Sequence, residues 1–455
     1  MSRADVPAEA LADRAQAEDL VARVVKRSKA DAVRVNLTSS YTTNLRFAAN
    51  QMSTAGAVTD AQLAVTSAFG AKHAVATTND LSDESVARVV AASEALAKLA
   101  PDDPESMPEL PPQSYASVGA YFGETASVSA GDRARVALTA LEPARAAGDL
   151  KAAGFLIANA TVSVVGNKVG LFAYHRSTGA NYTVTVRTAD GTGSGWAGVD
   201  NPDWTKIDFA ATSARAIQKA RASRTPVAVE PGRYTVIFEP QAVGDLVQLM
   251  GGYIDARQAD EGRSPFSKTG GGNKGGQQIV DTRITLLSDP RDPTLLDTPF
   301  DNEGMPLGRQ VWIENGVLKQ LQYTRFWAKK MKQEPTGQPG SLKLQASGAP
   351  MSADEMIAST KRGILVTRLW YLREVDPRTI LYTGLTRDGT FLIEDGKISK
   401  AVRNLRFNDS PLFMLGNLDA VGVPTRLAGT EAGGAVVMPA LKVHDFNFTS
   451  LSEAV

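Results

Sequence analysis

The chain has 455 residues, of which 43% are hydrophobic, and it carries 49 basic and 49 acidic residues. This length suggests about two to four domains with packed cores, and the composition excludes a disordered protein. A formal net charge of zero argues against nucleic acid as the main partner, and the absence of cysteine excludes disulfides, thiolate nucleophiles and Cys-ligated metals.

The N-terminus mixes charged and apolar residues and lacks the apolar core of a signal peptide. No apolar run reaches the roughly 18 residues that a membrane span needs. We therefore expect a cytoplasmic protein without a membrane segment.

The first segment, residues 1–110, is predicted to be an α/β domain. Apolar residues at helical spacing predict a helix over 5–28, and a second helix is expected over about 82–100. Between them, short strands are expected at 32–38, 41–48, 61–69 and 72–78. Five prolines within 101–113 then predict an extended linker, because proline fixes φ and lacks an amide donor.

Residues 111–225 are predicted to be a central α/β domain. Helices are expected near 130–147 and 203–223, with antiparallel strands at 162–167, 168–175 and 180–188 between them. Residues 226–455 begin with a strand at 234–240 and a helix from Gln241, and continue as many short strands with glycine turns. The predicted fold class is α+β: a mixed α/β N-terminal region followed by a β-rich, barrel- or sandwich-like C-terminal domain.

Several phrases of the C-terminal segment resemble one family, the TldD/PmbA family. They are PFDNEGMP at 299–306, VWIENGVLK at 311–319, LIEDGKI at 392–398 and RNLRFNDSPLFML at 403–415, and LRFAANQ at 45–51 resembles the family's N-terminal domain. The resemblance implies two kinds of subunit. TldD-type subunits carry HExxxH on a helix, with two zinc-binding histidines, a glutamate as general base and a cysteine near the C-terminus. TldE-type (PmbA) subunits share the fold without that motif, and the pair acts as a peptidase on short or unfolded peptides.

When the chain is aligned with the family on the preceding strand, Gly244 and Gly252, the three motif positions are Gln248, Leu249 and Tyr253. Leucine can neither bind a cation nor accept a proton, and amide and phenol groups are poor zinc ligands beside imidazole. The family's cysteine is also missing, and its expected neighbourhood is 436–443. We therefore predict no catalytic, metal or cofactor residues in this chain, and we expect Tyr253 to point toward the place that a metal holds in a catalytic relative.

Gly251 and Gly252 interrupt the same predicted helix, where each glycine costs about 1 kcal/mol relative to alanine. Close backbone packing is one explanation. A bulge that aligns residue i with i+5 is another. A third is an ordinary break between two short helices.

Histidine and acidic residues elsewhere in the chain are the remaining candidates for a metal site. His73, His175 and His444 lie in three different segments without ligand spacing, which favours isolated packing or polar roles. Asp255, Asp260 and Glu261 follow the motif helix, and we interpret them as a solvated helix end rather than a hard-cation site.

Three further motifs have both a structural and a functional interpretation. The loop 268–278 contains a formal GxGxxG at Gly270, Gly272 and Gly275, but no helix is predicted after it, which favours a surface loop over a dinucleotide site. Asp301 and Glu303 could serve acid-base chemistry, but the adjacent Asn302 and Gly304 favour a turn. Trp370, Tyr371 and Arg373 are typical of interfaces, although core packing is the first expectation for Trp370.

Three functions stay open at this point. The first is a non-catalytic TldE/PmbA-like subunit that shapes a peptide cleft for a TldD-like HExxxH partner, which would carry the zinc. The second is a stand-alone peptide-binding or structural homodimer without catalysis. The third is a peptidase with an unrecognised active site. No nucleic acid and no membrane is expected among the partners.

Overall fold

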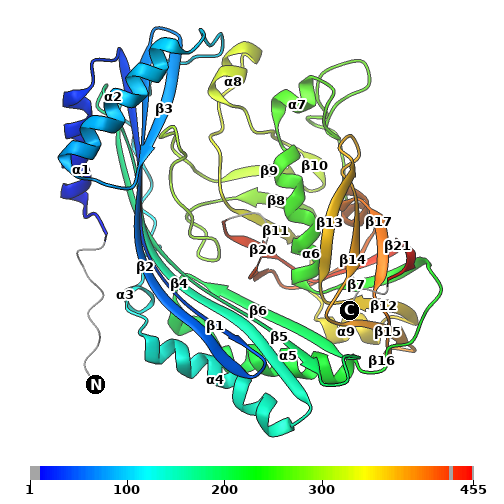
Figure 1. Ribbon diagram of the computed structural model, residues 1–455. Helices are drawn as coiled ribbons and strands as arrows, with labels where there is room; N and C mark the ends of the chain where they lie inside the picture. Colours follow the sequence, from blue (N-terminus) through cyan, green and yellow to red (C-terminus); the bar gives the residue numbers. More distant parts are fainter. Residues whose placement is uncertain (1–10, 430–433, 453–455) are drawn as a thin grey trace.

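The computed structural model describes residues 11–429 and 434–452, so the start of the predicted helix 5–28 lies outside the described residues. Figure 1 shows two parts: a long curved sheet with outer helices, and a strand-rich part on the right. The predicted α+β class is confirmed, with the mixed region first and the β-rich domain second. No helix among the described residues is both long and apolar enough to cross a membrane.

The N-terminal sheet is antiparallel throughout, with the strand order β3-β2-β1-β4-β5-β6. Its strands are β1 (Ala32–Ala48), β2 (Gln51–Phe69), β3 (Lys72–Thr78), β4 (Leu150–Asn167), β5 (Phe172–Thr188) and β6 (Ser194–Asn201). Its helices are α1 (Arg14–Arg27), α2 (Asp83–Leu99), α3 (Gly123–Ala126), α4 (Ala130–Ala147), α5 (Phe209–Ala222) and the 3-10 turn η2 (Trp204–Lys206).

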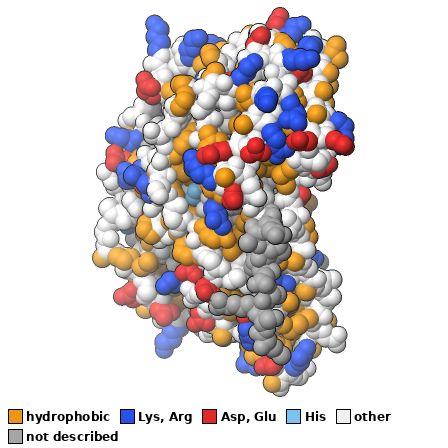
Figure 2. Space-filling view, turned by 90° about the vertical axis from the view of Figure 1, so that its left-hand side faces the viewer, with side chains coloured by type: hydrophobic (Ala, Val, Ile, Leu, Met, Phe, Trp, Pro, Cys, Tyr) orange, Lys and Arg blue, Asp and Glu red, His pale blue; other side chains and the backbone are white. Residues whose placement is uncertain are grey.

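Period-two alternation puts the helices on one face of this sheet. Val33 and Val35 of β1 pack against α1 and α2, and Leu45 and Phe47 of the same parity pack against α4 and α5. The helices therefore cover the outer face, and the other face looks toward the C-terminal part (Figure 1). Figure 2 looks onto the side that carries α1 and α2, where Lys and Arg side chains lie among hydrophobic ones.

Two strand predictions are corrected by longer elements. The segments 32–38 and 41–48 form the single strand β1, because Ser39 and Ser40 between them stay paired with Ala61 and Asp60 of β2. The strands expected at 168–175 and 180–188 likewise merge into β5, which begins only at Phe172. The predicted domains 1–110 and 111–225 share this one sheet, since β1 pairs with β4.

The predicted linker 101–113 contains no helix or strand and lies in the chain between α2 and α3, both in the N-terminal part. Glu105 forms an ion pair with Arg257 of the C-terminal part at 2.9 Å. Farther along, Tyr115 Oη donates to the carbonyl of Gly304 at 2.8 Å. These contacts hold the linker between the N-terminal sheet and the C-terminal part.

The C-terminal part is built on two sheets, with the orders β10-β9-β8-β11-β20-β19 and β13-β14-β17-β21-β7-β12-β15-β16, and β18 pairs with β21. One large hydrophobic core draws side chains from both sheets and from the helix between them. The strands are β7 (Gly232–Phe238), β8 (Ile284–Ser288), β9 (Gln310–Glu314), β10 (Val317–Leu318), β11 (Leu342–Ala346), β12 (Arg362–Val366), β13 (Leu369–Asp376), β14 (Leu381–Thr386), β15 (Thr390–Glu394), β16 (Lys397–Ala401), β17 (Leu405–Asp409), β18 (Leu418–Val421), β19 (Thr425–Arg426), β20 (Val436–Met438) and β21 (Leu441–Leu451). The helices are α6 (Pro240–Val247), the 3-10 helix η3 (Gln248–Tyr253), α7 (Ala256–Asp260), α8 (Arg325–Met331), α9 (Ala353–Ala358) and α10 (Pro411–Gly416).

Candidate functional site

The helix at the motif positions changes its winding in the middle. Proline at its first position suits a helix start, where the missing N–H needs no partner. The α-helix α6 ends at Val247 and passes directly into the 3-10 helix η3, which contains all three motif positions. The predicted irregularity at the glycine pair is confirmed. Of the three explanations for the glycine pair, the bulge is wrong, because a 3-10 helix is wound more tightly than an α-helix rather than more loosely.

The glycine pair itself faces open space. Apart from the chain neighbours and the backbone of its own helix, a Cβ built on Gly251 or Gly252 meets no described atom within 4 Å. Close backbone packing therefore does not explain why glycine stands at these two positions. The explanation that remains is an ordinary break between two short helical elements, α6 and η3.

The 3-10 winding decides which motif position faces which way. In such a helix the side chains at i and i+3 eclipse one another. Gln248 and Gly251 accordingly line one pocket. Met250 and Tyr253 are instead buried in the core, with exposed fractions of 0% and 8%. Leu249 packs at the edge of the same core, so Gln248 is the one predicted motif position among the lining residues of the pocket.

The pocket beside η3, which we call the motif pocket, has a volume of about 250 Å³. It lies between η3 and the six-stranded sheet. Val436 at the start of β20 belongs to its wall, so the fold brings the expected cysteine neighbourhood next to the motif helix. The lining residues are Gln248, Gly251, Gly252, Ile254, Ser288, Trp312, Gln322, Pro339, Gly340, Ser341, Leu342 and Val436.

The polar groups of the motif pocket are neutral and bond mostly to the backbone. Ser288 Oγ donates to the carbonyl of Ser341 at 2.5 Å and accepts from Trp312 Nε1 at 3.0 Å. The buried Ser341 hydroxyl has no hydrogen-bond partner among the described residues. Among the described residues that line the pocket there is no His, Asp, Glu or Lys, so the pocket offers hydrogen bonds to amide groups rather than general-base or nucleophilic chemistry.

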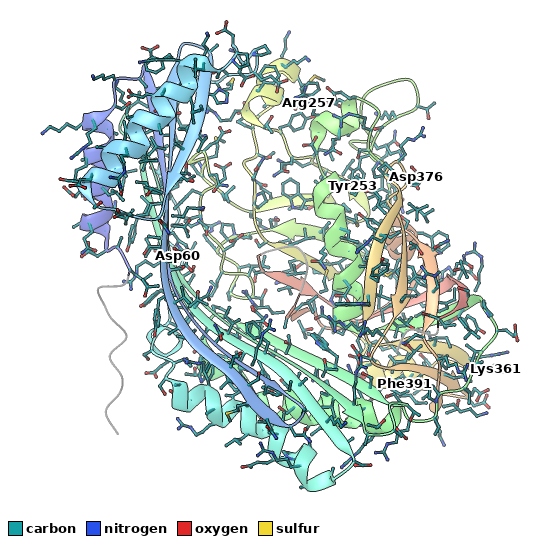
Figure 3. All side chains as sticks on the ribbon, in the orientation of Figure 1. Asp60, Tyr253, Arg257, Lys361, Asp376 and Phe391 are labelled. Atoms are coloured by element: carbon teal, nitrogen blue, oxygen red, sulfur yellow. The ribbon has the colours of Figure 1, made fainter. Side chains whose placement is uncertain are left out.

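The Tyr253 side chain forms its hydrogen bond outside the motif pocket. Its hydroxyl donates to the carboxylate of Glu374 on β13, and its carbonyl accepts from Ser264 Oγ at 3.2 Å. Figure 3 shows Tyr253 near the end of the motif helix, beside the strand that runs to Asp376. This last motif position ties the helix to β13 and is not among the lining residues of the motif pocket.

The donor set of the motif pocket does not fit zinc. Zinc in proteins takes imidazole, thiolate or carboxylate ligands, and the lining supplies amide, hydroxyl, indole and alkyl side chains. Within residues 11–429 and 434–452, no three His, Asp or Glu side chains gather around a place for one ion. The histidines lie on separate strands, as predicted: His73 on β3, His175 on β5 and His444 on β21.

The acidic residues after the motif helix have structural partners, which fits the predicted helix end. Asp255 caps α7 by accepting from the backbone of Gln258 at 2.7 Å. Asp260 accepts from Trp327 Nε1 at 2.8 Å, and Glu261 pairs with Arg257 at 3.1 Å.

The surface loop predicted at 268–278 and the turn predicted at Asp301 are both confirmed. The loop 268–278 is followed by turns and then by β8, with positive φ at Gly270 and Gly272, and no helix follows it as a dinucleotide site would need. Asp301 accepts from the backbone amides of Glu303 at 2.9 Å and Met305 at 3.0 Å, and Gly304 has φ +84°. The Asp301 carboxylate therefore stabilises a turn.

The core expectation for Trp370 is wrong. The residue is 39% exposed, and the guanidinium groups of Arg368 and Arg387 lie 4.9 and 4.8 Å from its ring. Tyr371 beside it is 54% exposed, with φ +54°. The reason is the position of β13 at the edge of its sheet, which leaves one side without a neighbouring strand.

Sequence reasoning did not find the wall of the motif pocket opposite η3. Ser288, Trp312 and Ser341 come from three separate segments, and no local spacing connects them. A larger cavity of about 570 Å³ lies elsewhere, where β6 meets the loop before β15, and it shares no lining residue with the motif pocket. There the buried Asp388 accepts from Ser194 Oγ at 2.5 Å and pairs with Arg368 at 3.4 Å.

Models of one family match the chain in three places. Domain 1 of the PmbA/TldA metallopeptidase matches residues 33–97, the central domain matches 123–224, and the C-terminal domain matches 231–450. These three matches follow one another in order and cover most of the chain.

Individual relatives agree with these matches. A metalloprotease of Methanothermobacter thermautotrophicus is 26% identical over 232 residues, which is 48% of each chain. The metalloprotease PmbA of Escherichia coli O157:H7 is 27% identical over 172 residues, or 37% of each chain, so the chain spans about half or less of the length of these curated relatives. The crystal structure of TldE from Thermococcus kodakarensis has the same fold, with a TM-score of 0.82 and 20% identity over 95% of this chain and 99% of that chain. On these matches, the chain belongs to the PmbA/TldD family, whose domains are described as those of a metallopeptidase.

Proposed function

We propose that the chain is a non-catalytic, TldE-like subunit of a peptidase that acts on short or unfolded peptides. The observation that carries this proposal is the set of side chains at the motif positions. Gln248, Leu249 and Tyr253 supply no zinc ligand of the usual kind and no general base, and the pocket beside them is neutral.

The physical case for such a subunit is a division of labour. Peptide cleavage needs an activated water and a cleft that holds the peptide backbone in the geometry of attack. Positioning alone can lower a barrier by several kcal/mol, on the order of 7 in favourable cases. A chain without metal can contribute this positioning through hydrogen bonds, and Gln248, Gln322 and the unpartnered Ser341 hydroxyl of the motif pocket are suited to amide groups.

The proposed partner is a TldD-like chain with HExxxH, which carries the zinc, and this chain needs no cofactor of its own. The setting proposed is the cytoplasm. The fold shared with TldE of Thermococcus kodakarensis supports an assembly of similar subunits, because copies of one fold associate readily with closed symmetry.

The test is hydrolysis of an unstructured peptide by the HExxxH partner from the same cell, by this chain, and by their mixture. We expect no cleavage by this chain alone, faster cleavage by the mixture than by the partner, and co-elution on gel filtration. The variant Gln322→Ala on the pocket wall should reduce the gain, whereas Gln345→Ala, on β11 outside the motif pocket, should not.

Two outcomes would favour the other candidate functions. Equal activity of partner and mixture without co-elution would reject the subunit function and favour a stand-alone peptide-binding homodimer. Cleavage by the purified chain alone, lost with a chelator, would reveal a peptidase site that the motif positions do not supply.

A further inference from the structure

The strand β5 has an open edge within the N-terminal sheet. Its neighbour β6 pairs with it only from Ala180 to Arg187. Among the described strands, none pairs with the stretch 172–179 on that side. An open edge presents unpaired N–H and C=O groups to any extended chain beside it.

Residues 114–122, which follow the linker, run along this open edge without closing it. Thr178 N donates to the carbonyl of Ala120 at 2.9 Å, and Phe122 N donates to Thr178 Oγ1 at 3.0 Å. Among the described residues, no partner accepts from the backbone N–H groups of residues 114–121. A gap of about 500 Å³ separates residues 113–121 from the edge at 172–176, and we call it the β5 edge groove.

Two arginines stacked on aromatic rings border this groove on the α1 side of the sheet. The guanidinium carbon of Arg176 lies 3.8 Å from the ring centre of Tyr121, and that of Arg14 lies 5.1 Å from the ring centre of Phe172. Arg14 already pairs with Glu18 through Nε at 3.0 Å. Within the described part of the chain, Arg176 has no carboxylate partner, which leaves its N–H groups free for an anion.

A buried imidazole borders the groove on the opposite side of the sheet. His175 is 6% exposed, and its Nε2 has no hydrogen-bond partner among the described residues. Burial lowers the pKa of His175 to about 4, so the ring is neutral near pH 7. Tyr115 lines the groove together with it. The two sides of the groove therefore differ: one offers positive charge, and the other offers neutral polar and aromatic groups.

We propose that the β5 edge groove binds an extended peptide with acidic side chains at alternate positions, which adds a strand to β5. Successive side chains of a strand point to opposite faces. Alternate residues of the bound peptide would thus meet Arg176 and Arg14 on one face and His175 on the other. The groove shares no lining residue with the motif pocket, so this inference goes beyond the proposed function and does not depend on a catalytic partner.

Strand addition and the bonding of arginine to carboxylates favour an acidic peptide over other ligands. Peptides commonly bind by adding a strand to an open sheet edge, with main-chain bonds for affinity and side-chain sites for specificity. The rings hold the guanidinium groups from one side and leave their N–H edges for carboxylates, which Arg binds through short charge-assisted bonds. The edge from Phe172 to Arg176 matches a peptide of about five residues at roughly 3.3 Å each.

The probe is a fluorescent, terminally blocked peptide of sequence Glu-Thr-Glu-Thr-Glu, with binding to the full chain measured by anisotropy. We expect salt-sensitive binding, a loss of about tenfold or more in Arg176→Ala, and a smaller loss in Arg14→Ala because of its pairing with Glu18. Arg46→Ala is the matched control, because Arg46 also stacks on an aromatic ring of this sheet, 5.1 Å from Phe155, but outside the groove. It should bind like the unchanged chain.

Two further probes test the backbone and the place of binding. The same peptide with N-methyl groups at alternate residues should bind at least about tenfold more weakly, because strand addition needs its amides. With only three histidines in the chain, saturation with the peptide should shift the imidazole NMR signal of His175 alone, assigned by His175→Gln. The proposal would be overturned if the acidic peptide did not bind, or if Lys-Thr-Lys-Thr-Lys bound with the same affinity. It would also be overturned if Arg176→Ala and Arg46→Ala bound the acidic peptide equally well. Weaker binding in Gln322→Ala but not in Arg176→Ala would also overturn it, because the peptide would then occupy the motif pocket.

Discussion

Tyr253, the last of the motif positions, donates its hydroxyl hydrogen to the carboxylate of Glu374 on the edge strand β13. The residue that would be a metal ligand in an HExxxH chain is thus a structural tether here. Because Tyr253 is 8% exposed and packs in the main core, its phenol ring also stabilises the fold by hydrophobic burial.

This tether predicts coupling between two substitutions. Tyr253→Phe keeps the ring and removes one hydrogen bond to a charged group, so the free energy of unfolding should fall by about 1 to 2 kcal/mol. Glu374→Gln should cost less, since an exposed side chain retains water. Urea unfolding of both single variants and the double variant measures the interaction, and strictly additive costs would show that the bond contributes nothing.

The glycines of the motif helix should respond to alanine in opposite ways. Gly251 and Gly252 face open space at ordinary φ, so the double alanine variant should gain about 1 kcal/mol of stability by restricting the unfolded chain. Gly244 on α6 is the matched control, because a Cβ there runs into the side chain of Leu427. Its alanine variant should lose about 1 to 3 kcal/mol. Thermal unfolding of both proteins checks this, and a destabilised Gly251–Gly252 variant would contradict it.

Restoring the motif residues should not restore a zinc site. At three residues per turn, positions 248 and 253 point about 120° apart, so Gln248→His/Leu249→Glu/Tyr253→His leaves its two imidazoles facing different surroundings. Elemental analysis should find far less than one zinc per chain. The variant Gln248→His/Gly251→His places two imidazoles at eclipsed positions and should retain more zinc. Stoichiometric zinc in the triple variant after mild chelation would refute the geometric argument.

Asp409 should make the stability depend on pH. Burial raises its pKa from 3.8 to about 6, although the amides of Ser410 and Asn447 partly oppose this rise. The folded chain therefore binds the proton more tightly than the unfolded chain. The resulting stabilisation is complete below about pH 3.8 and is lost as the pH rises through about 6, amounting to at most about 3 kcal/mol.

The comparison with Asp409→Asn isolates this effect. The free energy of unfolding of the unchanged chain, minus that of the variant, should fall between pH 4.5 and pH 7.5. His175 titrates in the opposite sense, because its lowered pKa removes stability as the pH falls from about 6.5 toward 4, and it is common to both proteins. A difference that stays constant with pH would show that Asp409 titrates normally.

The sequence predicted those parts of the fold that depend on residues close together in the chain, such as turns and the linker. The proline-rich linker, the Asp301 turn and the separation of the histidines followed from composition and spacing. Ser39 and Ser40 broke the apolar alternation and hid the continuity of β1, which only the pairing with β2 establishes. Trp370 was misplaced because an edge position depends on the whole strand order.

Of the two walls of the motif pocket, only the one formed by the motif helix was predicted from the sequence. The helix with Gln248 could be found from the resemblance, and its irregularity from the glycine pair. Its 3-10 winding could not, since the residues that pack around η3 come from distant strands. The same holds for Ser288, Trp312 and Ser341, which meet only after the sheet has formed.

The pairing of β1 with β4 has a consequence for biosynthesis. β1 ends at Ala48, and the strand that completes its other edge begins at Leu150, about 100 residues later. At typical synthesis rates the ribosome needs roughly 5 to 20 s for that stretch. During this time the nascent β1–β3 sheet carries an unpaired edge from Arg34 to Phe47, so overexpression and slow translation should promote aggregation through this strand before the rest of the chain emerges.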